Sequence, residues 1–307
     1  MADQNTAVDA NNEPVERRSL GRRVGAGVVG AAFLSALGPI GEALVNPAKA
    51  QSAISDLDIL NFALNLEYVE AEFYLRAVSG QGLSPSDTTG IGNVGQVNGG
   101  TAVPFSTPLY AQYANSIALD EQTHVRYLRS VLGSAAVARP VIDLAGGFQG
   151  AAVAAGIATS TSQFNPFADQ LSFFQGAYVF EDVGVTAYSG AAALIQNKAY
   201  LTAAASILAV EAYHGGLIRT VLGQAGFAAA FNTQAISNLR AQASKANNDQ
   251  GVLYPQNGFV NIAPADANGL AFQRTTAQVV NIATNGGQGT GGFLPFGFNG
   301  TIRDGRV

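Results

Sequence analysis

Apolar residues recur at alternating steps of three and four in four segments of the chain, as they do in helices that bury one face. Between these segments lie stretches rich in Gly, Ser, Thr, Asn and Pro, which favour turns and irregular connections. The pattern therefore predicts an all-α protein built on four long helices. They are expected to run from about Asp56 to Val78, Pro108 to Leu132, Pro166 to Leu194 and Tyr200 to Leu222.

The lengths of the connections predict how the four helices are arranged. A short turn joins the third helix to the fourth and favours antiparallel neighbours, whereas residues 133–165 are numerous enough to cross the bundle from end to end. Beyond the fourth helix, one more helix is expected near Ile236 to Ala246, followed by turn signals such as Asn-Gly and Gly-Gly. We therefore expect a four-helix bundle over residues 51–222 and an irregular C-terminal extension, residues 223–307, that wraps the bundle.

Polar side chains interrupt the four apolar stripes at positions that should face the centre of the bundle. Ionised carboxylates in such a core are unfavourable unless a positive charge compensates them, and bound metal ions would do so. Arginine or tyrosine partners are the alternative explanation. The predicted metal ligands are Glu67 on the first helix, Glu121 and His124 on the second, Glu181 on the third, and Glu211 and His214 on the fourth.

The spacing of these residues is typical of a site for two metal ions. The chain has only two histidines, and each follows a glutamate by three residues, in Glu121-Gln-Thr-His124 and Glu211-Ala-Tyr-His214. A spacing of three places both side chains on one helix face, so that each pair can bind the same cluster. The order Glu, Glu-x-x-His, Glu, Glu-x-x-His is the arrangement found in helix bundles that hold two metal ions.

Several residues near the predicted ligands have more than one interpretation. Glu70 follows Glu67 by three residues and is expected on a solvated flank, with a role as an extra ligand as the alternative. Glu72 is expected to face solvent. Tyr74 and Tyr188 each lie two turns beyond a predicted ligand, so that their phenols either reach the cluster or belong to the aromatic core.

The first fifty residues are typical of an export signal. Residues 17–23 read Arg-Arg-Ser-Leu-Gly-Arg-Arg, a weakly apolar stretch follows over residues 24–45, and Ala-Lys-Ala at 48–50 resembles a cleavage site. The apolar stretch is broken by a Gly-Pro pair and carries Glu42, which makes it a poor membrane span. Residues 1–50 are therefore predicted to be a twin-arginine-type signal segment, with an uncleaved amphipathic tail as the alternative. The mature protein should be periplasmic or secreted, without a stable membrane anchor after cleavage.

Composition excludes several classes of function. The net charge is −5 and charged residues make up only 12% of the chain, so a nucleic acid or an anionic lipid surface is an unfavourable partner. There are no cysteines, which excludes disulfides, thiolate metal sites and cysteine nucleophiles. These observations do not bear on self-association, and a homo-oligomer remains open.

The chain resembles the desiccation-related, ferritin-like domain family of plants, bacteria and fungi. The resemblance rests on Leu-Asn-Phe-Ala-Leu-Asn-Leu-Glu-Tyr at 60–68, Phe-Glu-Asp-Val-Gly-Val-Thr-Ala-Tyr at 180–188 and Ile-Leu-Ala-Val-Glu-Ala-Tyr-His at 207–214. The tail segments 264–268 and 291–300 also look like this family. The resemblance implies a ferritin-like four-helix bundle, and it extends over the chain from about residue 54 onward. The long tail departs from the cage-forming ferritins, so storage of a mineral core is not expected.

Carboxylate and imidazole ligands suit two iron or two manganese ions. Three redox reactions fit such a centre, with peroxide or oxygen as the small-molecule substrate. They are peroxide disproportionation, as in manganese catalases, which are similar in helix order; oxygen-dependent iron oxidation, as in ferritins; and oxidation of another substrate with an external electron donor. A non-enzymatic role in stress protection or metal sequestration is the alternative.

Catalytic roles can be assigned to two residues as hypotheses. The likeness to manganese catalases implies that Glu211, in the last Glu-x-x-His, acts either as a plain ligand or beside the bridging solvent. Tyr74 is the second catalytic candidate because its phenol could reach the cluster. Asp120 and Asp182 adjoin predicted ligands and are candidates to orient the second ring nitrogen of a bound histidine.

Overall fold

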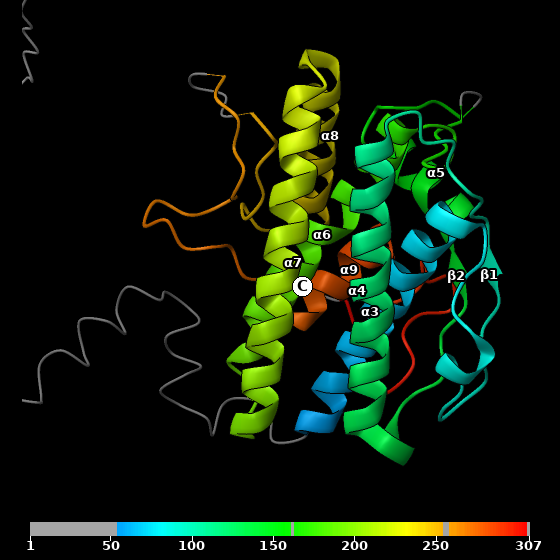
Figure 1. Cartoon of the computed structure of the whole chain (residues 1–307). Helices are drawn as coiled ribbons and strands as arrows, with labels where there is room; N and C mark the ends of the chain where they lie inside the picture. Colours follow the sequence, from blue (N-terminus) through cyan, green and yellow to red (C-terminus); the bar gives the residue numbers. More distant parts are fainter. Residues whose placement is uncertain (1–53, 161–162, 254–257, 306–307) are drawn as a thin grey trace, which may run out of the picture. The chain divides into compact units, whose positions relative to one another are not determined.

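Four long helices form the body of the protein, in the order that the apolar pattern predicts (Figure 1). The computed structural model describes residues 54–160, 163–253 and 258–305, so the signal segment predicted for residues 1–50 lies outside the described residues. The four helices make the predicted all-α, ferritin-like bundle. They are α3 (Asp56–Ser79), α4 (Pro108–Leu132), α6 (Gln170–Ala192) and α7 (Lys198–Gln224).

Local sequence explains where α3 begins and ends. The hydroxyl of Ser55 accepts a hydrogen bond from the backbone N–H of Asp58, whose carboxylate accepts from the N–H of Ser55 in return. This capping box satisfies two backbone donors that a helix start leaves without partners. Gly80 ends α3 with φ at 74°, a left-handed conformation that glycine adopts without strain.

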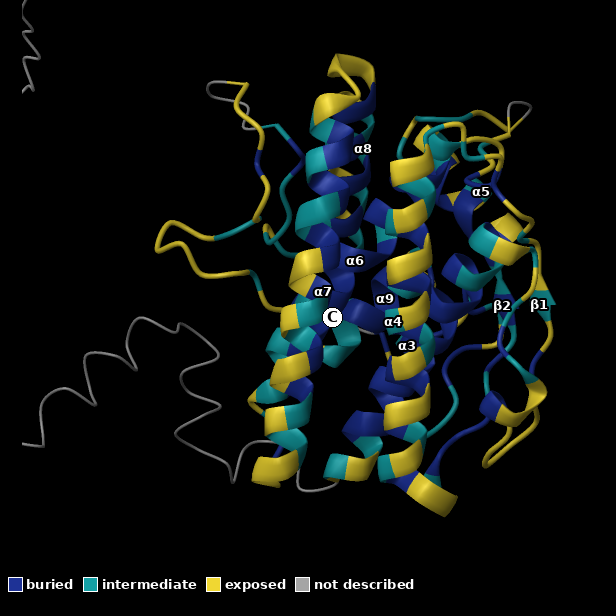
Figure 2. Cartoon of the chain, in the orientation of Figure 1, coloured by how far each residue is buried: buried dark blue, intermediate teal, exposed yellow. Residues whose placement is uncertain are grey.

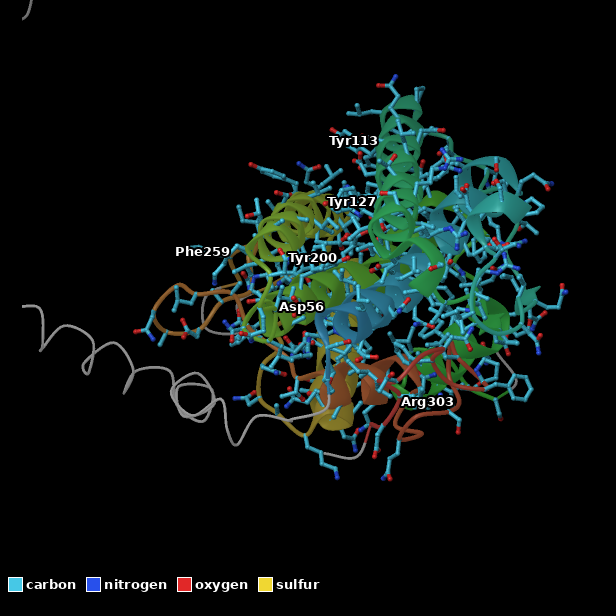
Figure 3. All side chains as sticks on the ribbon, turned by 90° about the horizontal axis from the view of Figure 1, so that it is seen from below. Asp56, Tyr113, Tyr127, Tyr200, Phe259 and Arg303 are labelled. Carbon is cyan, nitrogen blue, oxygen red and sulfur yellow. The ribbon has the colours of Figure 1, made fainter. Side chains whose placement is uncertain are left out.

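Contacts at the two ends of the bundle establish the direction of each helix. The side chain of Gln170 accepts a hydrogen bond from the backbone N–H of Thr107 at 3.0 Å, so α4 and α6 begin at the same end. At the other end, Asp56 accepts from the N–H of Asn197 at 2.8 Å, so α3 and α7 begin together. Figure 3 labels Asp56 and Tyr200 near the starts of these two helices. Since α4 and α6 run in parallel, their connection must cross the bundle, as predicted.

The crossover between α4 and α6 contains structure that the apolar pattern did not predict. Helix α5 (Leu144–Ala154) follows a two-residue strand β2 (Ile142–Asp143), which pairs in parallel with β1 (Val97–Asn98). The β1–β2 pair joins the crossover to the connection between α3 and α4. Two 3-10 turns, Pro85–Asp87 and Gly133–Ala135, complete these connections.

The C-terminal residues carry two further helices and close over the bundle. Helix α8 (Phe227–Ser244) begins earlier than the expected helix near 236–246, and α9 (Thr276–Ala283) was not expected. Both helices contact α6 and each other. Farther along, the amide of Asn65 exchanges two hydrogen bonds, each 2.9 Å long, with the backbone of Asn299, and the ring of Phe298 stacks on Phe62. The described residues of this extension belong to the same compact unit as the bundle.

Helix α3 is buried on almost every side (Figure 2), unlike α4, whose outer face carries exposed residues. The expectation that Glu72 faces solvent is therefore wrong. Its carboxylate is fully buried, pairs with Arg76 at 2.9 Å and accepts a hydrogen bond from Arg139 of the crossover. The solvated flank expected for Glu70 is wrong as well, since this residue is 5% exposed.

A network of buried charges fastens α7, α8 and the tail to α6. Asp182 of α6 accepts hydrogen bonds from Arg219 of α7 at 2.8 Å and from Arg240 of α8 at 2.9 Å. Asp249 lies between Arg240 and Arg274, at 2.7 and 2.6 Å. Since all three guanidinium groups are buried, loss of a carboxylate would leave a charge without compensation.

Among the described residues, α7 is the one helix that is long and apolar enough to cross a membrane, judged by length and composition alone. Core helices of soluble proteins meet the same criterion. Here α7 packs along α6 and buries two predicted metal ligands, Glu211 and His214, against it. Only 33% of its apolar window is buried, so this contact with α6 accounts for one face of α7 and not for the whole apolar window.

Candidate metal centre

All six predicted metal ligands meet at the middle of the bundle. Each long helix contributes from its buried stripe, and the three-residue spacing in α4 and α7 brings a glutamate and a histidine to the same helix face. None of the six side chains is more than slightly exposed. They are Glu67, Glu121, His124, Glu181, Glu211 and His214.

These residues form two overlapping groups, each with four potential ligand atoms that lie within 4.8 Å of one another. Two carboxylates belong to both groups, which is the arrangement that two neighbouring ions with bridging carboxylates require. Glu121 and Glu211 are shared; Glu67 and His124 complete one group, and Glu181 and His214 complete the other.

The facing atoms lie at distances that an ion between them would explain. Nδ1 of His124 is 3.2 Å from Glu67 Oε2 and 3.5 Å from Glu211 Oε1. Nδ1 of His214 is 3.1 Å from Glu121 Oε1 and 3.4 Å from Glu181 Oε2. All these atoms are buried and none has a hydrogen-bond partner. Unsatisfied buried polar atoms are rare and destabilising, so the donor set fits a pair of cations.

Two tyrosines orient the carboxylates that belong to one group only. The hydroxyl of Tyr74 donates a hydrogen bond to Glu181 Oε1, and the hydroxyl of Tyr188 donates to Glu67 Oε1. Each glutamate is left with its Oε2 atom facing a histidine and without a partner. Tyr74, a catalytic candidate from the sequence, therefore contacts the centre through Glu181.

The two aspartates beside the predicted ligands have different roles. Asp120 Oδ2 lies 3.2 Å from Nε2 of His214, so this carboxylate can fix the ring nitrogen that does not face the centre, as the sequence suggested. For Asp182 the same suggestion is wrong. Its described hydrogen bonds go to Arg219 and Arg240 in the buried charge network.

Burial and mutual charge strongly perturb the ionisation of the centre. Burial raises the pKa of Glu67 to about 7, and burial together with the charge of Glu121 raises the pKa of Glu211 well above its usual range. Burial also acts to raise the pKa of Glu121, but contact with the two histidines outweighs it and lowers that pKa to about 2. The pKa of His214, which burial alone would lower, is raised to about 12 by the carboxylates around it.

Metal binding should therefore release protons. The surrounding carboxylates also raise the pKa of His124 above its usual range, so both imidazoles are protonated at pH 7 in the metal-free protein. Each must become neutral to bind an ion, so loading should release at least about two protons per chain. Calorimetry in buffers of different ionisation enthalpy measures this number. In a His214→Gln variant the number of protons released per chain should fall by about one. Release of no protons by the unmodified protein would contradict the positive charges assigned to the two imidazoles.

Two residues beside the centre differ from the sequence-based prediction, since Glu70 was given a role there only as the alternative to a solvated flank and Gly184 was given none. Glu70 is buried, and no hydrogen bond of its carboxylate occurs among the described residues. Gly184 of α6 leaves the space in which Glu70 and Glu211 approach each other. A Cβ atom at this position would collide with Glu211 Oε2 and lie 3.4 Å from Glu70 Oε1. A glycine within a buried helical stripe, one turn after Glu181, is the signal that could have revealed this close approach.

Comparison with known proteins places the chain among ferritin-like sequences. The profile of the ferritin-like domain family matches residues 55–224. The desiccation-related protein PCC13-62 of Craterostigma plantagineum is 31% identical over 249 residues, which cover 75% of this chain and 78% of that protein. The ferritin-like catalase Nec2 of Nesocodon mauritianus is 27% identical over 269 residues, which cover 81% and 85%. No solved structure matches the chain.

Proposed function

The chain belongs to the ferritin-like domain family, and from this premise we propose that its buried centre holds two iron or two manganese ions for redox chemistry with peroxide or oxygen. The observation that carries the proposal is the sharing of Glu121 and Glu211 between two groups of otherwise unpartnered ligand atoms. Oxygen and imidazole ligands suit these two metals. Two adjacent ions of this kind can together exchange two electrons with one molecule of peroxide or oxygen.

The reaction that we favour is peroxide disproportionation, in which two molecules of hydrogen peroxide give two of water and one of oxygen. No external electron donor is needed, because one peroxide is reduced and the other oxidised. The relative named a ferritin-like catalase supports this choice. Ferroxidase-like iron oxidation by oxygen is the other redox reaction that the same ligand set supports.

The protein's own side chains would position and protonate the reactants. Glu121 and Glu211 would bridge the ions, while the hydroxyls of Tyr74 and Tyr188 hold the two remaining carboxylates in place. The carboxylate of Glu211 lies beside Glu70 at Gly184, so a Glu211 oxygen that binds no ion would be placed to hold a proton there. It would then serve as the acid or base beside the reacting oxygen atoms.

A non-enzymatic role is the second candidate, since the other relative is named a desiccation-related protein. In that case the ions would hold the four helices together during stress or would merely be sequestered.

Under either role we propose export by the twin-arginine route to the periplasm or the exterior, as residues 17–23 suggest. N-terminal sequencing of exported protein tests this, because the mature chain should begin at Gln51.

Metal analysis combined with an oxygen electrode decides between the two roles. Protein from the exported fraction should contain about two iron or manganese ions per chain and release oxygen steadily from hydrogen peroxide. Glu181→Gln removes a ligand charge and should reduce this release by at least about tenfold. Zinc alone, or no metal, would contradict the redox proposal. Two ions without peroxide turnover or iron oxidation would favour the non-enzymatic role.

A further inference from the structure

Two neighbouring apolar cavities lie beside the metal centre, between the bundle and the C-terminal helices. The inner cavity is bounded by α3, α6 and α9, and the outer one by α5, α6, α8 and α9; each has a volume of about 40 Å³. Three residues line both cavities, namely Val179 of α6, Ile282 of α9 and Phe293 of the tail. The two spaces therefore adjoin along one shared wall.

The outer cavity reaches the protein surface. Leu239 and Ala243 of α8 and Asn285 after α9 line it, and all three residues are partly exposed. Val179, which both cavities share, is partly exposed too. A small molecule could thus enter between α6, α8 and α9, and also beside Leu66 and Ala283, two partly exposed residues that line the inner cavity.

The inner cavity ends at the metal centre. Glu70 and Gly184 form part of its wall, and Gly184 is the position at which the carboxylates of Glu70 and Glu211 converge. Glu70 is the one titratable side chain in the lining of this cavity, and the described residues offer its carboxyl no hydrogen-bond partner. A polar group is thus available where the cavity meets the predicted bridging ligand Glu211.

The mostly apolar residues that line the two cavities determine which molecules can pass through them. An ion in such a space would lose its hydration without gaining compensating contacts. Oxygen forms no strong hydrogen bonds and would lose little, whereas hydrogen peroxide would give up hydrogen bonds of its two hydroxyl groups and regain one at the carboxyl of Glu70. Dry apolar cavities in proteins admit neutral guests such as xenon. The carboxyl of Glu70 can then form a hydrogen bond with a neutral guest at the inner end.

We propose that these two cavities form one apolar route through which a small uncharged oxidant, hydrogen peroxide or oxygen, reaches the metal centre, with Glu70 receiving it at the inner end. The identity of the guest rests on the proposed function, whereas the route itself does not. Metal ions would have to reach the centre by another path, because the apolar lining disfavours them.

Xenon tests the route without any need for activity. Crystals of the metal-loaded protein under xenon pressure should show xenon in the inner or the outer cavity, and Val179→Phe should remove it by filling the shared wall. Val153→Phe is the matched control, because Val153 is an exposed residue of α5 that lines neither cavity. If Val179→Phe fails to fold, Val179→Leu makes the same test with less added bulk. Absence of xenon from both cavities of the unmodified protein would overturn the route.

Kinetics test whether the oxidant uses this route. With metal content unchanged, Val179→Phe should lower kcat/KM for hydrogen peroxide by about tenfold while kcat changes less, and Val153→Phe should leave both within about twofold. Equal kcat/KM in the two variants would overturn the proposed passage of peroxide. If the unmodified protein binds xenon in the cavities but turns over no peroxide, the proposed function fails and the route stands.

Discussion

Replacing Glu121 with glutamine is expected to remove both metal ions at once, whereas Glu67→Gln should remove only one. Glu121 is shared by the two groups of ligand atoms, and its two oxygens face different histidines, at 3.1 Å from His214 and 3.6 Å from His124. Glu67 belongs to one group only. Loss of a shared negative ligand should therefore weaken both positions together.

Metal analysis at equal free metal concentration measures this difference. Glu121→Gln should retain less than about 0.2 ions per chain, and its rate of oxygen release from peroxide should fall by at least about 100-fold. The expected effect is large because even residues that only orient metal ligands alter metal affinity or activity by about 10–100-fold. Glu67→Gln should retain about one ion. Gln122→Ala, beside Glu121 but partly exposed, is the control and should retain the full metal content. One tightly bound ion left in Glu121→Gln would show that this glutamate serves a single position.

Asp182→Asn should destabilise the protein by about 3 kcal/mol or more, because the variant leaves two buried arginines short of a negative charge. Arg219 would lose its ion pair with Asp182 and keep neutral acceptors such as the carbonyl of Gly251, while Arg240 would keep its ion pair with Asp249. The substitution conserves volume, so the effect reports charge and hydrogen bonding instead of a cavity. Chemical denaturation of the metal-free protein measures it without a contribution from metal binding.

Asp87→Asn provides the matched control for this experiment. Asp87 pairs with Arg126 at 3.0 Å, but the side chain of Arg126 is half exposed. Ion pairs of this kind contribute between about zero and 1 kcal/mol, so this variant should unfold almost like the unmodified protein. An equal decrease in the free energy of unfolding in Asp182→Asn and Asp87→Asn would contradict the stabilising role assigned to the buried network.

The metal ligands could be found from the sequence because the information is local. A glutamate and a histidine three residues apart face the same way on any α-helix, whatever surrounds them. The limits of α4 were also predictable, since Pro108 favours a helix start and Gly133 a helix end. The start of α6 was misjudged by four residues, because Asp169 caps the helix and the chain before it remains irregular.

The surroundings of the ligands could not be predicted in the same way, because their partners are distant in sequence. Glu72 was expected in solvent because Arg139, which contacts it in the core, follows 67 residues later. The glycine-rich sequence of α5 disfavours a helix by itself, and that helix depends on the cap by Asp143 and on the burial of Phe148. The burial of Glu72 and the formation of α5 therefore depend on tertiary contacts, which the local sequence pattern does not predict.

The hydrogen bonds between Asn65 and Asn299 also set an order of events in biosynthesis. These residues are 234 positions apart, so the contact that covers α3 near Glu67 cannot form until almost the whole chain has left the ribosome. At about 5–20 residues per second, translation of this interval takes on the order of 10–50 s. Throughout that time the helix that carries Glu67 lacks its cover. If the centre binds ions as proposed, they would enter most easily after His214 has been synthesised and before the last segment of the chain docks. A protein truncated before residue 299 should then exchange its ions more readily than the complete chain.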